Sequence, residues 1–342
     1  MNSIVDAKKR RYKKFYGLSP EVKKLFHIHI TKDSETNPPP RLWRENMRQR
    51  IDYAARAYEL SMRRLEWLHD DFIPFAPCVT GTEIFAEACG SEVIKTEDSN
   101  PFALPFITEA SEVSKVKIPK LEDSSLYCLF DMADEIIKKC GSGVLLTLPD
   151  VQTPMDIAAL IWDKNYLFIA MVEEPEAVKE LAHKISVLYY AFFDEWFKRY
   201  GTEFMAHCPD YYMPSGLTVS EDEIGSVSSA VFDELFLPEL INITNRYSGI
   251  GIHCCANARH QWDNFKKVPK LKMLNLVQPY NVIVESTTYF AGHTAMFPNW
   301  SGAGEPETWF SQLDGNAHVL LDFFVQNEDK AKELAELFVA RV

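Results

Sequence analysis

The chain has 342 residues, of which 46% are hydrophobic and 13% aromatic, so it can bury a large core. Its formal net charge is −13 and its dense basic run is confined to residues 8–14, which argues against a nucleic-acid partner. The N-terminus lacks the apolar core of a secretory signal, no apolar stretch is long enough to span a membrane, and the 7 cysteines do not suggest a disulfide framework, so we expect a reduced cytoplasmic protein without a membrane partner.

Residues 1–70 predict a helical extension ahead of the main domain. Residues 1–37 are polar with a helical tendency, and the three prolines at 38–40 then force an extended segment. A long amphipathic helix is expected from Arg41 to about His69, because apolar residues recur there at three- and four-residue spacing.

From about residue 70 onward, short apolar strands alternate with amphipathic helices, which is typical of α/β units with parallel strands. We therefore predict a (β/α)8 TIM barrel over residues 71–342, with the extension of residues 1–70 packed against it. A doubly wound open sheet also fits the alternation, but no Gly-x-Gly-x-x-Gly or phosphate loop follows an early strand. The predicted strands are 71–76, 143–149, 204–206, 250–254, 271–276, 281–285 and 319–325.

The longest helix of this region is expected over residues 176–200, between Pro175 and Gly201. Its apolar residues fall on one stripe, which predicts the face that packs on the core. The stripe consists of Val178, Leu181, Ile185, Leu188, Phe192 and Trp196.

The segment 250–257 reads Ile-Gly-Ile-His-Cys-Cys-Ala-Asn and ends a predicted strand in metal-binding residue types. Side chains alternate along a strand, so His253 and Cys255 point to one face and Cys254 to the other. An imidazole and a thiol on one face supply two of the three protein ligands of a catalytic zinc site. For the third ligand, Cys208 is a candidate, and Asp322 or Glu285 could equally supply an oxygen. Alternatively, the pair is a hydrogen-bonded histidine beside a small thiol.

In a barrel, functional groups follow the C-terminal ends of the strands. The polar side chains at these places that we expect to line a cleft for a small-molecule substrate are Glu83, Asp150, Gln152, His207 and Tyr212. Asp150 suits a general base or a cation ligand, but it also suits the cap of the helix that follows.

The chain resembles the uroporphyrinogen decarboxylase superfamily, and specifically its methyltransferase-like branch, over roughly residues 70–342. The resemblance is carried by the order and spacing of five segments: Thr82–Gly90, Gln152-Thr-Pro-Met-Asp156-Ile-Ala, Glu174-Pro175-Glu176-Ala-Val, Phe236-Leu-Pro238 and Gly251-Ile-His253-Cys-Cys255-Ala-Asn257. The last segment is similar to the family's His-x-Cys element, in which histidine and cysteine bind zinc. The resemblance implies a (β/α)8 barrel whose site lies at the C-terminal ends of the strands.

Methyltransferase members of this superfamily use zinc to activate a thiol and exchange methyl groups with a corrinoid, so the resemblance implies zinc, a corrinoid and a corrinoid protein as partner. The branch's later cysteine ligand is absent here, and Val319-Leu-Leu-Asp322 stands at about that place. Two alternatives remain open: a metal-free decarboxylase, and a non-catalytic protein that binds a corrinoid or tetrapyrrole. The Arg-Gln-Ala-Gly-Arg-Tyr type of motif found in the decarboxylase branch has no equivalent, because Arg48-Gln49-Arg50 lacks the Ala-Gly.

Overall fold

The computed structural model describes residues 2–300 and 311–339 and has mixed α/β architecture. The strands are β1 (Lys24–Ile30), β2 (Val93–Ile94), β3 (Phe102–Ala103), β4 (Phe204–Met205), β5 (Tyr212–Met213), β6 (Leu217–Ser220), β7 (Ile250–Cys254), β8 (Leu271–Gln278), β9 (Ala295–Met296), β10 (Asn299–Trp300) and β11 (His318–Val325). The helices are α1 (Asn2–Tyr16), α2 (Thr31–Thr36), α3 (Met47–Arg64), α4 (Ile84–Ala88), α5 (Cys128–Cys140), α6 (Pro154–Ile161), α7 (Lys164–Glu173), α8 (Pro175–Tyr200), α9 (Ser229–Val231), α10 (Leu237–Tyr247), α11 (Trp262–Phe265), α12 (Tyr280–Tyr289) and α14 (Glu328–Val339).

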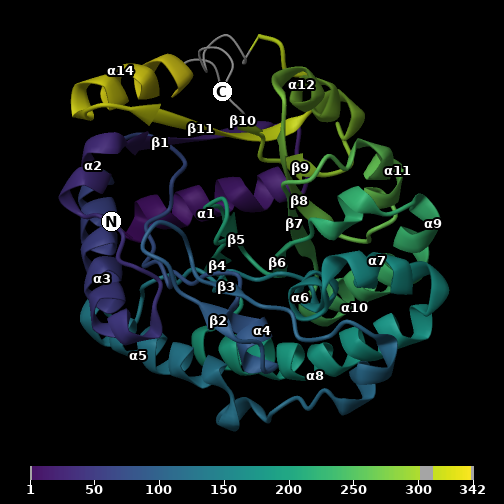
Figure 1. Ribbon diagram of the computed structural model, residues 1–342. Coiled ribbons are helices and arrows are strands. Elements are labelled where there is room, and N and C mark those ends of the chain that lie inside the picture. The colour runs from purple at the N-terminus through teal and green to yellow at the C-terminus, as the bar shows by residue number, and fades with distance from the viewer. Residues whose placement is uncertain (1, 301–310, 340–342) are drawn as a thin grey trace.

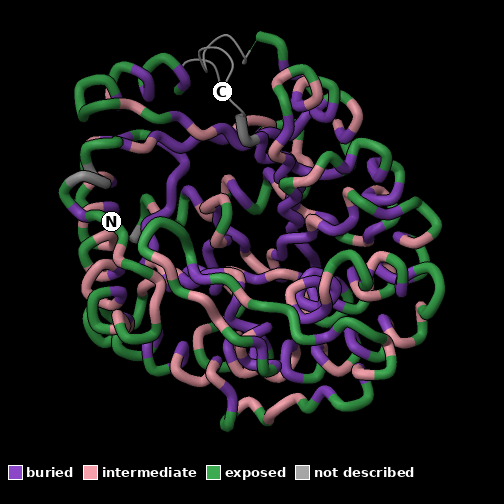
Figure 2. Tube along the Cα trace, in the orientation of Figure 1, coloured by how far each residue is buried: buried purple, intermediate pink, exposed green. Residues whose placement is uncertain are grey.

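The central sheet is parallel, and its strands follow the order β1-β11-β9-β8-β7-β6, with β10 paired to β8. Helices surround these strands in Figure 1, with α3 on the left, α8 along the bottom and α14 at the top. The buried parts of the chain lie mainly along the strands and on the inner faces of the helices, whereas the exposed parts lie on the periphery (Figure 2). This arrangement is consistent with the predicted TIM-like barrel.

Isolated parallel bridges extend this row of strands beyond β6. They join Gln152 to Ser220, Thr147 to Met205, and Ala76 to Leu146. No closed barrel of continuous strands forms among the described residues. A physical reason is that Pro74 and Pro77 interrupt the chain around the predicted strand 71–76, and Pro149 interrupts the predicted strand 143–149. Proline has no N–H to donate to a ladder.

Strand β1 corrects the expectation that residues 1–70 contain helices only. The segment Lys-Leu-Phe-His-Ile-His-Ile pairs along its whole length with β11, so it belongs to the central sheet. Its apolar residues alternate with histidines, and this short pattern is easily overlooked in a polar N-terminal region.

The strand predicted at 281–285 is also wrong, because these residues lie within helix α12. Valine and isoleucine favour strands. Here, however, β8 already ends at Gln278, and Pro279 precedes a helix that buries Ile283 against the sheet. Tertiary packing therefore overrides the local preference.

Helix α1 covers one end of the row of strands. Lys8 pairs with Asp70, which comes just before the segment 72–76, and Phe15 packs against His318 at the start of β11. Both contacts are made at the N-terminal ends of strands, so the C-terminal ends open on the opposite side. No helix of the described chain has the length and apolar composition needed to cross a membrane.

Candidate functional site

The end of β7 brings His253 and Cys255 together, as the alternation of strand side chains predicts. The His253 Nε2 atom lies 2.9 Å from Cys255 Sγ, and the other ring nitrogen, Nδ1, bonds to the Asn275 side chain on β8. His253 is buried and Cys255 is exposed. Asn275 therefore fixes the ring so that Nε2 faces the thiol, in the manner of an outer-shell partner of a metal ligand.

A glycine within β7 leaves room for the side chain of Tyr211, which lies on the loop between β4 and β5. A Cβ atom at Gly251 would lie 2.4 Å from the Tyr211 hydroxyl, so a side chain there would displace the buried Tyr211 ring. Cys208 lies on that same loop. The tip of the Tyr211 side chain thus lies against the strand that carries His253.

Asp222, which follows the end of the neighbouring strand β6, holds the turn after β7. Its Oδ1 accepts a hydrogen bond of 2.5 Å from the backbone N–H of Cys255. Asp222 is held in turn by buried Asp156, whose carboxylate accepts the N–H groups of Asp222 at 2.7 Å and Glu223 at 3.1 Å. The backbone of Cys255 is therefore tied to helix α6 through two carboxylates.

Asp156 and Glu221 form a buried pair of carboxyl groups beneath this turn, each 1% exposed. Burial raises the pKa of Asp156 to about 6. Burial, together with neighbouring Asp156, raises the pKa of Glu221 well above its usual value. The Thr153 hydroxyl donates to Glu221 at 2.6 Å. A carboxyl group whose pKa rises on folding stabilises the fold below its unfolded pKa of about 4.3, and this contribution is lost as the pH rises.

We expect Glu221→Gln to flatten the loss of stability between pH 5 and pH 8. Glutamine can still accept from Thr153 and can donate to Asp156, but it has no proton to lose. Urea unfolding at both pH values should show that the variant gains stability relative to the unmodified protein as the pH rises. Glu336→Gln, on the exposed face of α14, is the matched control and should leave the pH profile unchanged. A parallel pH profile for Glu221→Gln would contradict this role.

Acidic surroundings keep the Cys255 thiol protonated. Burial, followed by the carboxylates of Asp222, Asp150 and Asp156, raises the pKa of Cys255 to about 11. A bare thiolate is thus disfavoured at this position at neutral pH. A cation held among these carboxylates would have the opposite effect on the thiol.

Asp150 and His207 come together at the C-terminal ends of the strands, the side of the fold that we call the mouth. The Asp150 Oδ2 atom lies 3.5 Å from His207 Nε2, and the backbone N–H of Asp150 donates to the Thr80 hydroxyl at 2.7 Å. Burial raises the pKa of Asp150 and lowers the pKa of His207. His207 is therefore a neutral imidazole at pH 7 and can accept a proton.

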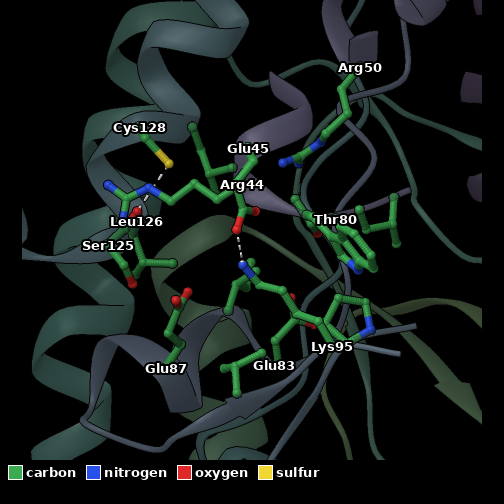
Figure 3. Close-up of a pocket in the computed structure, with 16 residues that line it drawn as sticks. Arg44, Glu45, Arg50, Thr80, Glu83, Glu87, Lys95, Ser125, Leu126 and Cys128 are labelled. Carbon is green, nitrogen blue, oxygen red and sulfur yellow. Dashed lines mark hydrogen bonds and ion pairs between the residues drawn. The ribbon is translucent and has the colours of Figure 1, made fainter. Parts of the chain in front are cut away.

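Glu83 lines a cavity of about 290 Å³, and Thr80, which binds the backbone N–H of Asp150, lines it as well. Charged side chains of both signs surround this cavity, including Arg44, Arg50 and Glu83 (Figure 3). Burial raises the pKa of Glu83 to about 7, and its Oε2 atom has no hydrogen-bond partner among the described residues. This Oε2 atom is itself buried within the wall of the cavity.

The structure places the remaining expected site residues differently. Gln152 forms the bridge to Ser220 beside the mouth. Tyr212 is fully buried in β5, with its ring edge-on to Tyr12 of α1 at a centroid distance of 5.5 Å. Cys208 is exposed, and its pKa is raised to about 12 by burial of the sulfur and by nearby carboxylates, Asp150 foremost.

The histidines of β1 were not anticipated from the sequence. In the described part of the chain, the triplet of potential metal ligands whose donor atoms lie within 4.8 Å of one another is His27, His29 and Asp322. The triplet His253, Cys255 and Cys208 does not meet this spacing. Burial alone would raise the pKa of Asp322, but the two histidines outweigh it and hold this pKa well below its usual value. The available signal was the pattern His-Ile-His in an apolar run, which puts both imidazoles on one face of a strand.

No protein-family model matches the sequence, and comparison with curated proteins also gives no match. In fold, the chain is similar to a solved structure described as a methyltransferase from Methanosarcina mazei. The TM-score is 0.67, 98% of each chain is covered, and the sequence identity is 12%. At this identity the similarity is one of fold, and it extends over the whole chain.

Proposed function

We propose that the chain is a zinc-assisted, corrinoid-linked methyltransferase of the uroporphyrinogen decarboxylase superfamily that acts on a thiol or a small methylated substrate. The fold supports this proposal, because a protein described as a methyltransferase shares it over 98% of both chains. The observation that carries it is the pair of His253 Nε2 and Cys255 Sγ, 2.9 Å apart at the C-terminal end of β7.

The donor set at β7 fits zinc in chemistry and orientation. One imidazole and one sulfur are two of its preferred ligands, and Asn275 fixes the ring of His253 from behind. The third position would require Cys208 or a carboxylate of the same mouth to move closer, because none of them forms a closely spaced triplet with His253 and Cys255 in the described chain. When bound, zinc would lower the pKa of a coordinated substrate thiol and so supply a nucleophilic thiolate.

The other residues of the mouth would bind and deprotonate the substrate. His207 is neutral, lies on the same mouth as Cys255 and can accept the proton of an incoming thiol, with Asp150 stabilising the imidazolium that forms. Asp222 holds the backbone of Cys255, which keeps the sulfur in place while the substrate binds.

The charge of the mouth favours methyl transfer over decarboxylation of a polyanionic substrate. Asp150, Asp222 and Asp210 are all close enough to Cys208 or Cys255 to raise the pKa of a thiol. A substrate rich in carboxylates would be repelled by these groups. A cationic or neutral methyl donor would not.

The test is metal content measured by elemental analysis of the purified protein. We expect one zinc equivalent per chain to be lost from both His253→Ala and Cys255→Ala, together with methyl transfer from a methylated corrinoid to a thiol acceptor. Cys254→Ala is the matched control, because this buried thiol points away from His253 and bonds weakly to the Ala256 carbonyl. It should retain both zinc and activity.

Two outcomes would contradict this proposal. If the unmodified protein and both variants contain the same amount of zinc, His253 and Cys255 are not its ligands. If zinc is lost but no methyl transfer is found with any corrinoid or thiol, the site binds metal and the methyltransferase assignment is wrong.

A further inference from the structure

Strands β1 and β11 bring three metal-binding side chains together in a place separate from the β7 pair. His27 and His29 project from the same face of β1, and Asp322 of β11 lies directly across from His27 in the parallel register. The Asp322 Oδ1 atom lies 3.3 Å from His27 Nδ1 and 2.9 Å from His29 Nε2. One donor atom from each residue lies within 4.8 Å of the others.

The orientation of His27 points to a ligand between these residues. His27 is fully buried, and its Nε2 atom lies 2.6 Å from the hydroxyl of Tyr12 on α1. Its buried Nδ1 atom faces the Asp322 carboxylate, whose Oδ1 lies 3.3 Å away. Tyr12 thus holds the ring from one side, and the other nitrogen shares the Asp322 carboxylate with His29. A fixed second nitrogen also orients the ring of a metal-binding histidine.

The spacing of the donors agrees with a metal ion. Nitrogen and oxygen ligands lie about 2.0–2.2 Å from zinc, so two ligands of a tetrahedral ion are about 3.3 Å apart. The separation of His27 Nδ1 and Asp322 Oδ1 has this value, at 3.3 Å. The 2.9 Å between His29 Nε2 and Asp322 Oδ1 is the length of a direct hydrogen bond, so the His29 ring would have to move outward for an ion to lie between them.

We propose that His27, His29 and Asp322 form a binding site for a divalent first-row transition metal ion. Two imidazoles and one carboxylate are a donor set that binds such ions and leaves coordination positions open. The site uses none of the β7 residues, so it does not depend on the methyltransferase proposal. It adds a second metal centre, of nitrogen and oxygen ligands, to the mouth of the fold.

A cavity of about 540 Å³ gives this site access to small molecules. His29, Asp210 and Arg64 all line it, together with aromatic side chains that include Phe72. The side chains of His29 and Asp322 are 23% and 18% exposed, so solvent reaches the site through His29, which lines this cavity. The ligand class that fits is water, because Arg64 already contacts Asp70 and the Ile28 carbonyl.

Cobalt(II) is the probe that distinguishes the two centres. We expect Co²⁺ bound at His253 and Cys255 to show a sulfur-to-metal charge-transfer band. Co²⁺ bound by nitrogen and oxygen ligands shows only ligand-field bands. In the Cys255→Ala protein, titration with Co²⁺ should therefore give one equivalent with ligand-field bands alone. The Tm should rise on binding, because the ion binds the folded state.

Variants at the β1–β11 site complete the test. Asp322→Asn keeps the shape of the side chain, and His29→Ala removes a half-buried ring, so both should fold; each is expected to weaken Co²⁺ binding at least tenfold in the Cys255→Ala background. His293→Ala, on the exposed turn after α12, is the matched control and should bind normally. The proposal is overturned if the Cys255→Ala protein binds no Co²⁺, or if Asp322→Asn and His29→Ala bind it as tightly as the control.

Discussion

Replacing Asp70 by Ala is expected to lower the free energy of unfolding by about 3–5 kcal/mol, because it leaves a buried ammonium group without its counter-charge. Asp70 and Lys8 are each less than a tenth exposed, and the Lys8 Nζ atom lies 3.1 Å from Asp70 Oδ1. The carboxylate also accepts the backbone N–H groups of Ile28 and Phe72, both at 3.2 Å. Urea unfolding at pH 7 measures the loss.

The same carboxylate links α1, β1 and the segment 72–76, so its removal should affect the β1 site as well. We expect weaker Co²⁺ binding at His27 and His29, because Ile28 between them loses a backbone partner. Glu333→Ala is the matched control: Glu333 also pairs with a lysine, Lys330, but this pair is exposed and should contribute little. If Asp70→Ala and Glu333→Ala destabilise the protein equally, the buried pair does not have the proposed role.

A large part of the fold could be predicted from the sequence because long apolar patterns are reliable. The strand predicted at 250–254 is confirmed as β7 with the same bounds, and the helix predicted at 176–200 begins one residue earlier as α8. Both have a strong period and clear glycine or proline boundaries. The predictions for β1 and α12 were wrong for the opposite reason. A short segment has few residues to define its period, and packing decides its conformation.

The candidate site could be predicted only in part. Alternation within one strand is a local property, so the sequence placed His253 beside Cys255, and the distance of 2.9 Å agrees with that prediction. The grouping of Asp322 with His27 depends on the pairing of the first and last strands, almost 300 residues apart. No pattern within a single segment contains that information, and only the three-dimensional structure reveals it.

Phe192→Ala is expected to cost about 3–5 kcal/mol of unfolding free energy, as truncation of a fully buried aromatic side chain usually does. Phe192 is 0% exposed and lies on the predicted stripe of α8, all of whose members are buried. Its ring contacts Phe130 of α5 at a centroid distance of 5.1 Å and Phe85 of α4 at 5.6 Å. The substitution would leave a cavity between three helices, which are too constrained by their other contacts to close it.

Val187→Ala on the same helix provides the comparison, because this side chain is 60% exposed and its loss should change stability little. Both variants should keep the m-value of the unmodified protein, since neither changes the surface exposed on unfolding by much. Equal effects of the two substitutions would mean that the buried stripe does not anchor α8. A large loss for Phe192→Ala alone would instead show that the buried stripe anchors α8 against α4 and α5.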